Sequence, residues 1–238
     1  MLILAIDTTG AEGGVAIYRD EARLALIPNT RPANIYSVSL FEMVEAALAE
    51  TKLRLNDMDL FAAASGPGSF TGIRVGLAAI QGWSRACSKP ARGVSALEAL
   101  VEICQPRTQV AIPLMDARRG EFYLNLFRRT ASLASDGSRF EAASEGWTLP
   151  ANAMRSWVEK IALADIENLT WIARESDKAA QTLRQTLSLP GEWQRTAEPL
   201  LGAIARIAGR NLKQDPNPER PLDALYIRRS DAELNWKG

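Results

Sequence analysis

Four glycines fall within the twelve residues SGPGSFTGIRVG (65–76), which follow the apolar run LFAAAS (60–65) and lead into an apolar stretch with helical periodicity. Glycine allows backbone conformations that other residues avoid, and exposed N–H groups at the start of a helix attract anions. The stretch therefore predicts a strand, a tight turn and a helix in succession. Its composition raises the question of whether the turn binds a phosphate.

Neither familiar phosphate motif fits this spacing. A Walker loop places Lys and then Ser or Thr after its second glycine, but Ile73 and Arg74 follow Gly72. A dinucleotide fingerprint needs G-x-G-x-x-G, whereas Gly66, Gly68 and Gly72 give G-x-G-x-x-x-G, and no acidic residue near position 90 could hold a ribose. The local sequence leaves two roles open, a tight turn that allows close packing and a phosphate site.

The composition excludes several classes of chemistry. The chain contains no histidine, which removes the commonest general base, the commonest transition-metal ligand and every Ser-His or Cys-His nucleophile pair. Cys87 and Cys104 have no C-x-x-C spacing, so neither a disulfide framework nor a thiolate metal site is indicated. The formal net charge of zero argues against a global basic field for nucleic acid. Three arginine pairs are interpreted as solvated surface: 118/119, 128/129 and 228/229.

The apolar stretches of the sequence are too short and too interrupted to span a bilayer. The first of them, MLILAIDTT, contains the charged Asp7 where a signal peptide would still be apolar. We therefore expect a cytoplasmic protein with no membrane partner.

The first third of the chain alternates strand-like and helix-like patterns. Apolar residues recur every three or four positions in one segment, as one face of a helix requires. The predicted elements are a strand at 2–6, a hairpin turning near Asp20-Glu21, a helix at 35–52, a strand at 60–65 and a helix at about 71–88 capped by Ser69 or Thr71.

The rest of the chain predicts a second lobe and a return to the first. The predicted elements are a strand at 91–95, a helix at 96–104, two strands within 108–127 joined at 118–120, a long loop at 130–150, helices near 151–164 and 177–187 around a strand at 169–174, and a helix at about 197–212. The final extended piece, with Leu225 and Ile227 alternating with polar-tipped residues, is predicted to pack back on the first lobe over 222–228.

The helix predicted at 71–88 has two apolar faces. One is a stripe of small residues, which implies a close contact because each helical glycine costs about 0.5 to 1 kcal/mol relative to alanine. The protein's own sheet and a partner helix are both possible contacts. The small face holds Gly72, Gly76, Ala79, Gly82 and Ala86, and the bulky face holds Ile73, Leu77, Ile80 and Trp83.

Four stretches, ILAIDTTGAEGGVAIY, ASGPGSFTGIRVGLAAIQGW, MDARRGEFY and ALYIRR, together resemble the TsaB (YeaZ) family of the bacterial tRNA threonylcarbamoyladenosine machinery. The resemblance implies an α/β fold of the actin-like, sugar-kinase-like (ASKHA) duplicated type, with two lobes that each hold a mixed β-sheet and helices. The lobes are expected at 1–105, joined by the returning segment 197–238, and at 106–196.

The resemblance also implies a function without catalysis, cofactor or metal. Such proteins bind a TsaD catalytic subunit, which transfers threonylcarbamoyl from its adenylate to adenosine 37 of tRNA with the ATPase TsaE assisting, so tRNA is an indirect partner. A homodimer is possible for the isolated chain. The implied partner interface consists of Val38, Phe41, Gly72, Gly76, Ala79, Ile80 and Trp83.

In ATP-binding relatives the first hairpin presents an acidic residue and small polar groups to Mg-phosphate. The corresponding residues form a vestigial phosphate site here: Asp7, Thr8, Thr9, Gly68 and Ser69. The alternative function is therefore an active Mg-ATP-dependent phosphotransferase or ATPase of the same fold. The chain departs from the family's usual His and Pro in the first helix, since Tyr36 and Glu42 occupy those places.

Overall fold

The structure is a computed structural model that describes residues 1–31, 35–130, 139–144, 146–161, 168–217 and 222–227. It divides into two compact units: unit 1 comprises residues 1–99 and 199–226, and unit 2 comprises residues 100–198 with Ile227. The lobe boundaries expected from the sequence stay a prediction.

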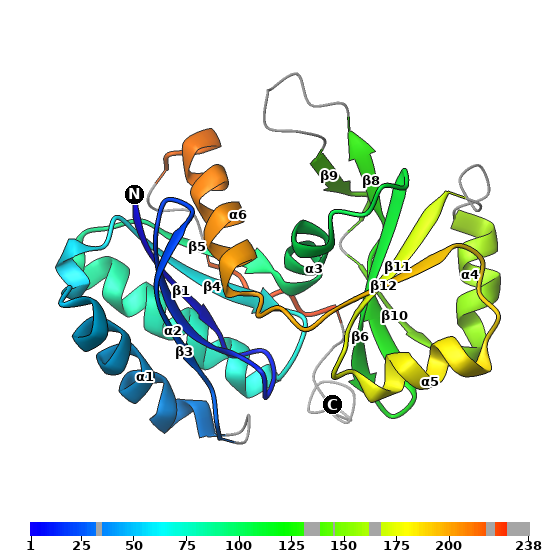
Figure 1. Cartoon of the computed structure of the whole chain (residues 1–238), viewed down its shortest axis with the longest axis horizontal. Helices are drawn as coiled ribbons and strands as arrows, with labels where there is room; N and C mark the ends of the chain where they lie inside the picture. The colour runs from blue at the N-terminus through cyan, green and yellow to red at the C-terminus, as the bar shows by residue number, and fades with distance from the viewer. Residues whose placement is uncertain (32–34, 131–138, 145, 162–167, 218–221, 228–238) are drawn as a thin grey trace, which may run out of the picture. The chain divides into compact units, whose positions relative to one another are not determined.

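Unit 1 is a five-stranded sheet covered by helices on both faces (Figure 1). The strand order is β3-β2-β1-β4-β5, in which β1, β4 and β5 run parallel and β2 and β3 antiparallel to their neighbours. The elements are β1 (Leu2–Asp7), β2 (Gly14–Arg19), β3 (Ala22–Pro28), α1 (Tyr36–Thr51), a 3-10 turn (Leu55–Asp57), β4 (Leu60–Gly66), α2 (Phe70–Cys87), β5 (Ala91–Ser95) and α6 (Leu201–Gln214). The helix α3 (Ala96–Cys104) follows β5 directly.

The continuous apolar sequence of β1 follows from burial on both faces of the sheet. Leu4 and Ile6 belong to the core cluster that α1 and α2 cover. Ile3 faces the other side, where its side chain lies close to Gly209 of α6. Both faces of β1 are therefore shielded from solvent. The strand leads into polar residues that lie beside the glycine turn.

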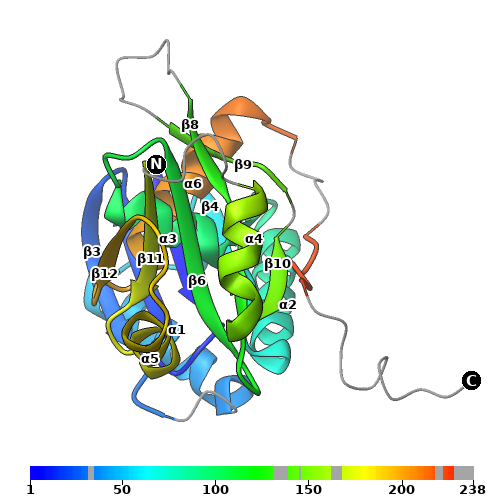
Figure 2. The same ribbon diagram turned by 90° about the vertical axis from the view of Figure 1, so that its right-hand side faces the viewer.

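Unit 2 is built on a seven-stranded sheet with the path β10-β7-β6-β11-β12, and β8 pairs with β6 and β9. Residues of α4 and α5 pack into one core cluster with β6 and β11. Figure 2 shows these two helices beside the strands. The elements are β6 (Val110–Arg118), β7 (Glu121–Leu124), β8 (Phe127–Thr130), β9 (Arg139–Ala142), β10 (Trp147–Pro150), a 3-10 turn (Ala151–Ala153), α4 (Met154–Ile161), β11 (Leu169–Arg174), α5 (Lys178–Thr186) and β12 (Glu192–Thr196).

The elements predicted between residues 2 and 104 are confirmed with small shifts at their ends. The second half differs from the sequence prediction at four places. The second strand predicted within 108–127 ends at Leu124 and a separate strand, β8, begins at Phe127. The long loop predicted at 130–150 contains β9 and β10, the strand β12 was not predicted, and the last helix begins at Leu201 rather than near 197. Part of the predicted loop, 131–138 and residue 145, lies outside the described residues.

The segment 222–226 returns to unit 1, as the sequence predicted. The backbone N–H of Leu225 donates to the carbonyl oxygen of Ser65 at 2.8 Å, at the end of β4. Leu222 and Ala224 pack against the core cluster under α1 and α2. The prediction is confirmed for residues 222–226, although they form no strand. It is wrong for Ile227, which groups with unit 2, and residue 228 lies outside the described residues.

Candidate functional site

The end of β1 brings three buried polar residues to the glycine turn. Asp7, Thr8 and Thr9 are 2%, 1% and 5% exposed. The carboxylate oxygen Oδ1 of Asp7 accepts hydrogen bonds from the backbone N–H of Thr9 at 2.9 Å and from its hydroxyl at 2.6 Å. The hydroxyl of Thr8 donates to the carbonyl oxygen of Gly72 at 2.7 Å. These groups therefore bind one another and the start of α2.

The glycine turn packs directly on this strand end. The backbone N–H of Ser69 donates to the carbonyl oxygen of Thr9 at 2.7 Å. A Cβ atom at Gly68 would lie 2.5 Å from that same oxygen, and one at Gly72 would lie 2.0 Å from the carbonyl oxygen of Thr8. Such distances are too short for any side chain. The contacts favour the first of the two roles left open by the sequence, a turn whose glycines allow close packing.

Ser69 starts α2, as one of the two predicted caps. Its hydroxyl oxygen accepts a hydrogen bond from the backbone N–H of Gly72 at 3.2 Å. This bond satisfies one of the amide groups left unpaired at a helix start. The residue predicted as part of a phosphate site thus has a local structural role.

The structure separates the residues predicted for a partner interface. Gly72, Gly76 and Ile80 are buried against the sheet of unit 1, where a Cβ atom at Gly76 would lie 2.5 Å from the hydroxyl oxygen of Thr8. They offer no surface to a partner, because Gly72 and Gly76 pack on the strand end and Ile80 lies in the core cluster of unit 1. The other four predicted residues reach solvent and lie on neighbouring helices: Val38 and Phe41 on α1, and Ala79 and Trp83 on α2.

These four residues, here called the α1/α2 surface, form one apolar area. Val38 is 56% exposed and Phe41 is 51% exposed, and with Tyr226 they are the large exposed hydrophobic side chains among the described residues. The ring of Phe41 meets the ring of Trp83 edge-on at 6.1 Å, which joins the two helices. Figure 1 shows α1 and α2 side by side on the same face of the sheet. An exposed apolar area of this kind is a candidate interaction site.

Tyr36 fixes the first turn of α1, and the sequence analysis did not foresee this role. Its hydroxyl donates to the carbonyl oxygen of Gly10 at 2.7 Å, and the side chain is 1% exposed. A Cβ atom at Gly13 would lie 2.4 Å from the same hydroxyl. Tyr36 therefore holds α1 to the turn between β1 and β2, and the glycine at position 13 leaves the space for it.

The Tyr36→Phe variant should lower the free energy of unfolding by about 1 kcal/mol, because the half-buried carbonyl of Gly10 loses one of its two donors and keeps only the N–H of Gly13 at 3.4 Å. Urea unfolding followed by circular dichroism would measure the change. Tyr226→Phe is the matched control, because Tyr226 is 42% exposed and water can accept the hydrogen bond that Arg74 donates to its hydroxyl oxygen. Equal losses in the two variants would contradict the anchoring role of Tyr36.

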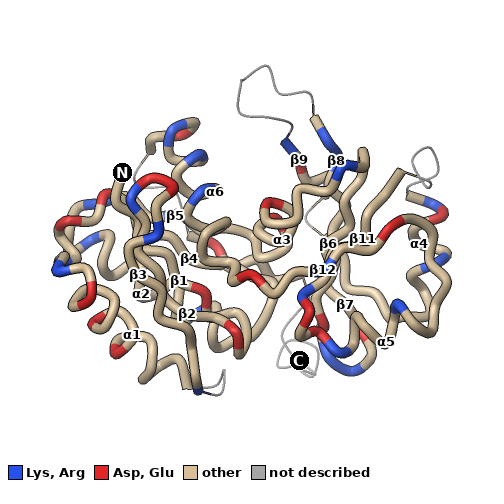
Figure 3. The backbone as a smooth tube through the Cα atoms, in the orientation of Figure 1, with Lys and Arg blue, Asp and Glu red and all other residues tan. Residues whose placement is uncertain are grey.

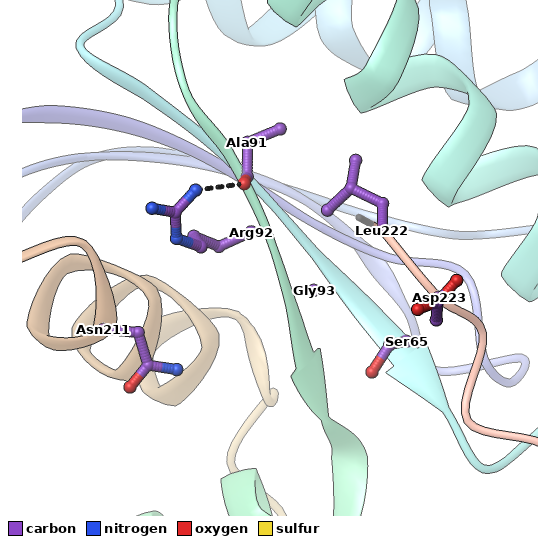
Figure 4. Close-up of a pocket in the computed structure, with 7 residues that line it drawn as sticks. All are labelled: Ser65, Ala91, Arg92, Gly93, Asn211, Leu222 and Asp223. Carbon is purple, nitrogen blue, oxygen red and sulfur yellow. Dashed lines mark hydrogen bonds between the residues drawn. The ribbon is translucent and has the colours of Figure 1, made fainter. Parts of the chain in front are cut away.

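A cavity of about 230 Å³ lies at β5 in unit 1 (Figure 4). Figure 4 shows Ser65 and Asp223 near each other on one side of β5, and Arg92 with Asn211 on the other. Arg92 is only 2% exposed, and its guanidinium donates to the carbonyl oxygens of Ala91, Asp215 and Asn217. We interpret Arg92 as a structural residue that holds the chain after α6. The cavity is lined by Ser65, Ala91, Arg92, Gly93, Asn211, Leu222 and Asp223.

Two of the predicted arginine pairs lie in unit 2. Arg118 and Arg119 are exposed at the turn between β6 and β7, where both adopt positive φ angles, 65° and 56°. Arg128 is exposed on β8, whereas Arg129 is half-buried and donates to the carbonyl oxygen of Thr108 at 3.1 Å. Three of these four arginines therefore face solvent, as expected. The third pair, 228/229, lies outside the described residues.

The thiol of Cys104 is a poor candidate for a nucleophile. Burial raises its pKa to about 11, and the nearby carboxylate of Glu198 adds to the shift. A thiol with this pKa stays protonated at neutral pH, and the thiolate is the reactive form. Burial also raises the pKa of Asp177 above its usual value. Within the described ranges, no group of three or more His, Cys, Asp or Glu is placed to hold a metal ion.

Comparison with known proteins identifies the family. The family model described as TsaD, tRNA N6-adenosine threonylcarbamoyltransferase, matches residues 31–155, which is more than half of the chain. The chain is 31% identical over 128 residues to the tRNA threonylcarbamoyladenosine biosynthesis protein TsaB of Bacillus subtilis, and 31% identical over 147 residues to TsaB of Escherichia coli. The chain belongs to the TsaB (YeaZ) branch of this family.

The matched parts are only a portion of each protein. They cover 54% of this chain and 56% of the Bacillus subtilis protein, and 60% of this chain and 62% of the Escherichia coli protein. The chain therefore matches somewhat more than half the length of these relatives.

The solved structure of YeaZ from Pseudomonas aeruginosa matches 90% of this chain and 93% of its own, with a TM-score of 0.69 and 21% identity. This match concerns the fold. The expected α/β architecture of two mixed sheets with their helices is confirmed, and the fold is that of the YeaZ structure. The assignment to the actin-like (ASKHA) duplicated type stays a prediction. Among the described helices, none has the length and apolar character needed to cross a lipid bilayer.

Proposed function

We propose that this chain is a noncatalytic subunit that binds and activates a TsaD-type catalytic subunit for threonylcarbamoyl transfer to adenosine 37 of tRNA. A TsaE-type ATPase would assist the reaction. The chain would interact with tRNA only indirectly, through the complex, and the complex would be cytoplasmic. The observation that carries the proposal is the exposed apolar α1/α2 surface on a chain of the TsaB branch.

The polar residues at the end of β1 support a role without catalysis. The sequence contains no histidine, so imidazole can serve neither as a base nor as a metal ligand. The oxygen Oδ1 of Asp7 and the hydroxyl of Thr8 are already hydrogen-bonded within the protein. The turn at Gly68 and Ser69 packs on Thr9 without room for a further side chain. These contacts favour a structural role for the strand end and the glycine turn.

The α1/α2 surface supports a helical partner. Its four residues come from two neighbouring helices, and two of them, Val38 and Phe41, leave more than half of their side-chain area in water. Removing such area from water contributes about 25 cal/mol per Å², from which the entropy cost of association is subtracted. The same surface could pair with a second copy of the chain when the partner is absent. We therefore propose a homodimer for the isolated chain.

The direct test is reconstitution with the TsaD-type and TsaE-type proteins of the same organism. The chain should co-elute with the TsaD-type protein in size-exclusion chromatography. Addition of tRNA, ATP, threonine and bicarbonate, with the enzyme that makes the threonylcarbamoyl adenylate, should then give the modified nucleoside by mass spectrometry. Modification that proceeds equally well without the chain, or a failure to form the complex, would contradict the proposal.

The second candidate function is an Mg-ATP-dependent phosphotransferase or ATPase, and Asp7 at the end of β1 is the feature that favours it. We expect negligible ATP hydrolysis by the isolated chain, because Thr9 and the glycine turn occupy the surroundings of that carboxylate. Phosphate release from Mg-ATP would be measured for the wild type and for Asp7→Ala. A robust turnover that Asp7→Ala abolishes would establish the enzyme and overturn the noncatalytic role.

A further inference from the structure

Three polar side chains that line the cavity at β5 have no partner in the described part of the chain. Ser65, near the end of β4, is only 8% exposed, whereas Asn211 is half-buried and Asp223 is exposed. Among the described residues, no group hydrogen-bonds to the hydroxyl of Ser65, the side-chain amide of Asn211 or the carboxylate of Asp223. Buried polar groups are normally paired, so the hydroxyl of Ser65 points to a ligand of this cavity.

The free edge of β5 adds backbone groups to the same cavity. β5 ends the path of the sheet and pairs with β4 on one side. The N–H of Phe61 donates to the carbonyl oxygen of Pro90 at 3.1 Å, so Pro90 directs its carbonyl towards β4. Backbone groups alternate in direction along a strand, and Gly93 therefore directs its N–H and carbonyl away from β4, to the free edge.

Gly93 also keeps space open beside the unpaired hydroxyl. A Cβ atom at this position would lie 3.2 Å from the Cβ atom of Ser65 and 3.7 Å from its hydroxyl oxygen. A larger side chain on β5 would crowd this side of the cavity. The glycine thus leaves both its own backbone groups and the hydroxyl of Ser65 accessible to a ligand.

Opposite charges line the two sides of β5. Figure 4 shows Asp223 beside Ser65 on one side of the strand, and Arg92 with Asn211 on the other. The guanidinium of Arg92 donates to three backbone carbonyl oxygens, which fix its position and carry no net charge. A purely cationic ligand would be repelled by Arg92, and a purely anionic ligand by Asp223. The cavity therefore favours a ligand that carries both charges.

We propose that this cavity binds a small zwitterion of the α-amino acid class. The carboxylate of Asp223 and the hydroxyl of Ser65 accept from its ammonium group, and the amide of Asn211 and the N–H of Gly93 donate to its carboxylate. The volume of about 230 Å³ lies below the range of about 300 to 1,000 Å³ for drug-sized ligands, so the ligand has few non-hydrogen atoms. The inference does not rest on the proposed function, because the cavity lies within unit 1 of the isolated chain.

The test is a nuclear magnetic resonance titration of the full-length, isotopically labelled chain. The probes are L-serine and two analogues that each lack one of its charges: ethanolamine has no carboxylate, and glycerate has no ammonium group. Serine should cause saturable shifts of the backbone amide signals of Ser65, Gly93 and Asp223. Each analogue should bind at least about tenfold more weakly, because it loses the hydrogen bonds of one charged group.

Two variants test the side chains that bind the ammonium group. Asp223→Asn should weaken serine binding by about tenfold, and Ser65→Ala by about threefold or more. Both should keep the melting temperature of the wild type, because neither side chain has a partner among the described residues. Glu21→Gln is the matched control, which removes an exposed carboxylate at the acidic turn between β2 and β3 (Figure 3) and should bind serine within about twofold of wild type.

Three results would overturn the inference. The first is a wild-type chain that shows no saturable binding of serine. The second is ethanolamine or glycerate binding as tightly as serine, since the site would then recognise a single charge. The third is serine affinity unchanged in both Asp223→Asn and Ser65→Ala, which would place the bound serine elsewhere. None of these results concerns the α1/α2 surface, which is tested separately with the TsaD-type protein.

Discussion

The Ala79→Arg variant should remain folded and bind a TsaD-type subunit at least about a hundredfold more weakly than the wild-type chain. Ala79 is half-buried on the side of α2 that faces the α1/α2 surface, next in the helix to the buried Ile80. An arginine there can extend into solvent in the free chain. In a complex it would place bulk and an unpaired charge inside a close helix contact, which is costly.

The matched control is Ala46→Arg on α1, which makes the same chemical change at another exposed site. Ala46 lies five residues after Phe41, about 140° around the helix, and so is on the side of α1 away from Phe41 and its contact with Trp83. Val38→Arg is a second disrupting variant, at a side chain that is 56% exposed and therefore poses little risk to folding.

Light scattering would report assembly of these variants, and reconstituted tRNA modification would report function. Ala79→Arg and Val38→Arg should be monomeric and inactive as subunits, and Ala46→Arg should behave as wild type. Wild-type affinity in both disrupting variants would show that the partner binds elsewhere. The apolar residues on α1 and α2 would then need another explanation.

The periodicity of α2 predicted the helix but could not assign its small residues to one face. Gly72 and Gly76 are buried against the end of β1, whereas Gly82 and Ala86 are exposed. The two steps of three residues from Gly76 to Gly82 fall short of the helical repeat of 3.6 residues, so together they turn the stripe by about 120° around the helix. Only the contacts in the folded structure show which of these small residues face the sheet and which face solvent.

The strands missed by sequence reasoning are short and weakly patterned. β8, β9, β10 and β12 have four or five residues each, too few for a clear alternation. β12 is defined by pairing with β11, where Trp171 and Trp193 are register partners and their rings stack. The contact of Arg74 with Tyr226 could not be predicted from local sequence patterns, because 152 positions separate the two residues. By contrast, Val38 and Phe41 were expected at a partner interface from the sequence, and their apolar side chains are exposed in the structure.

The same substitution at two glycines of α2 should change stability in opposite directions. Gly72→Ala should lower the free energy of unfolding by about 3 kcal/mol or more, because its Cβ atom would lie 2.0 Å from the backbone carbonyl oxygen of Thr8. Gly82→Ala should raise it by about 0.5 to 1 kcal/mol, since a Cβ atom there meets nothing within 4 Å and alanine favours the helix.

Equilibrium unfolding in urea would measure both changes on one scale. Gly82→Ala controls for the gain in helix propensity that Gly72→Ala also receives, so the difference between the two variants isolates the contact with Thr8. That contact keeps the start of α2 against β1, where Asp7 and Thr9 are hydrogen-bonded. If Gly72→Ala were as stable as wild type, α2 could move away from the strand end at little cost. The space between the turn and Asp7 could then open for a phosphate, and the case for a noncatalytic chain would lose its main structural support.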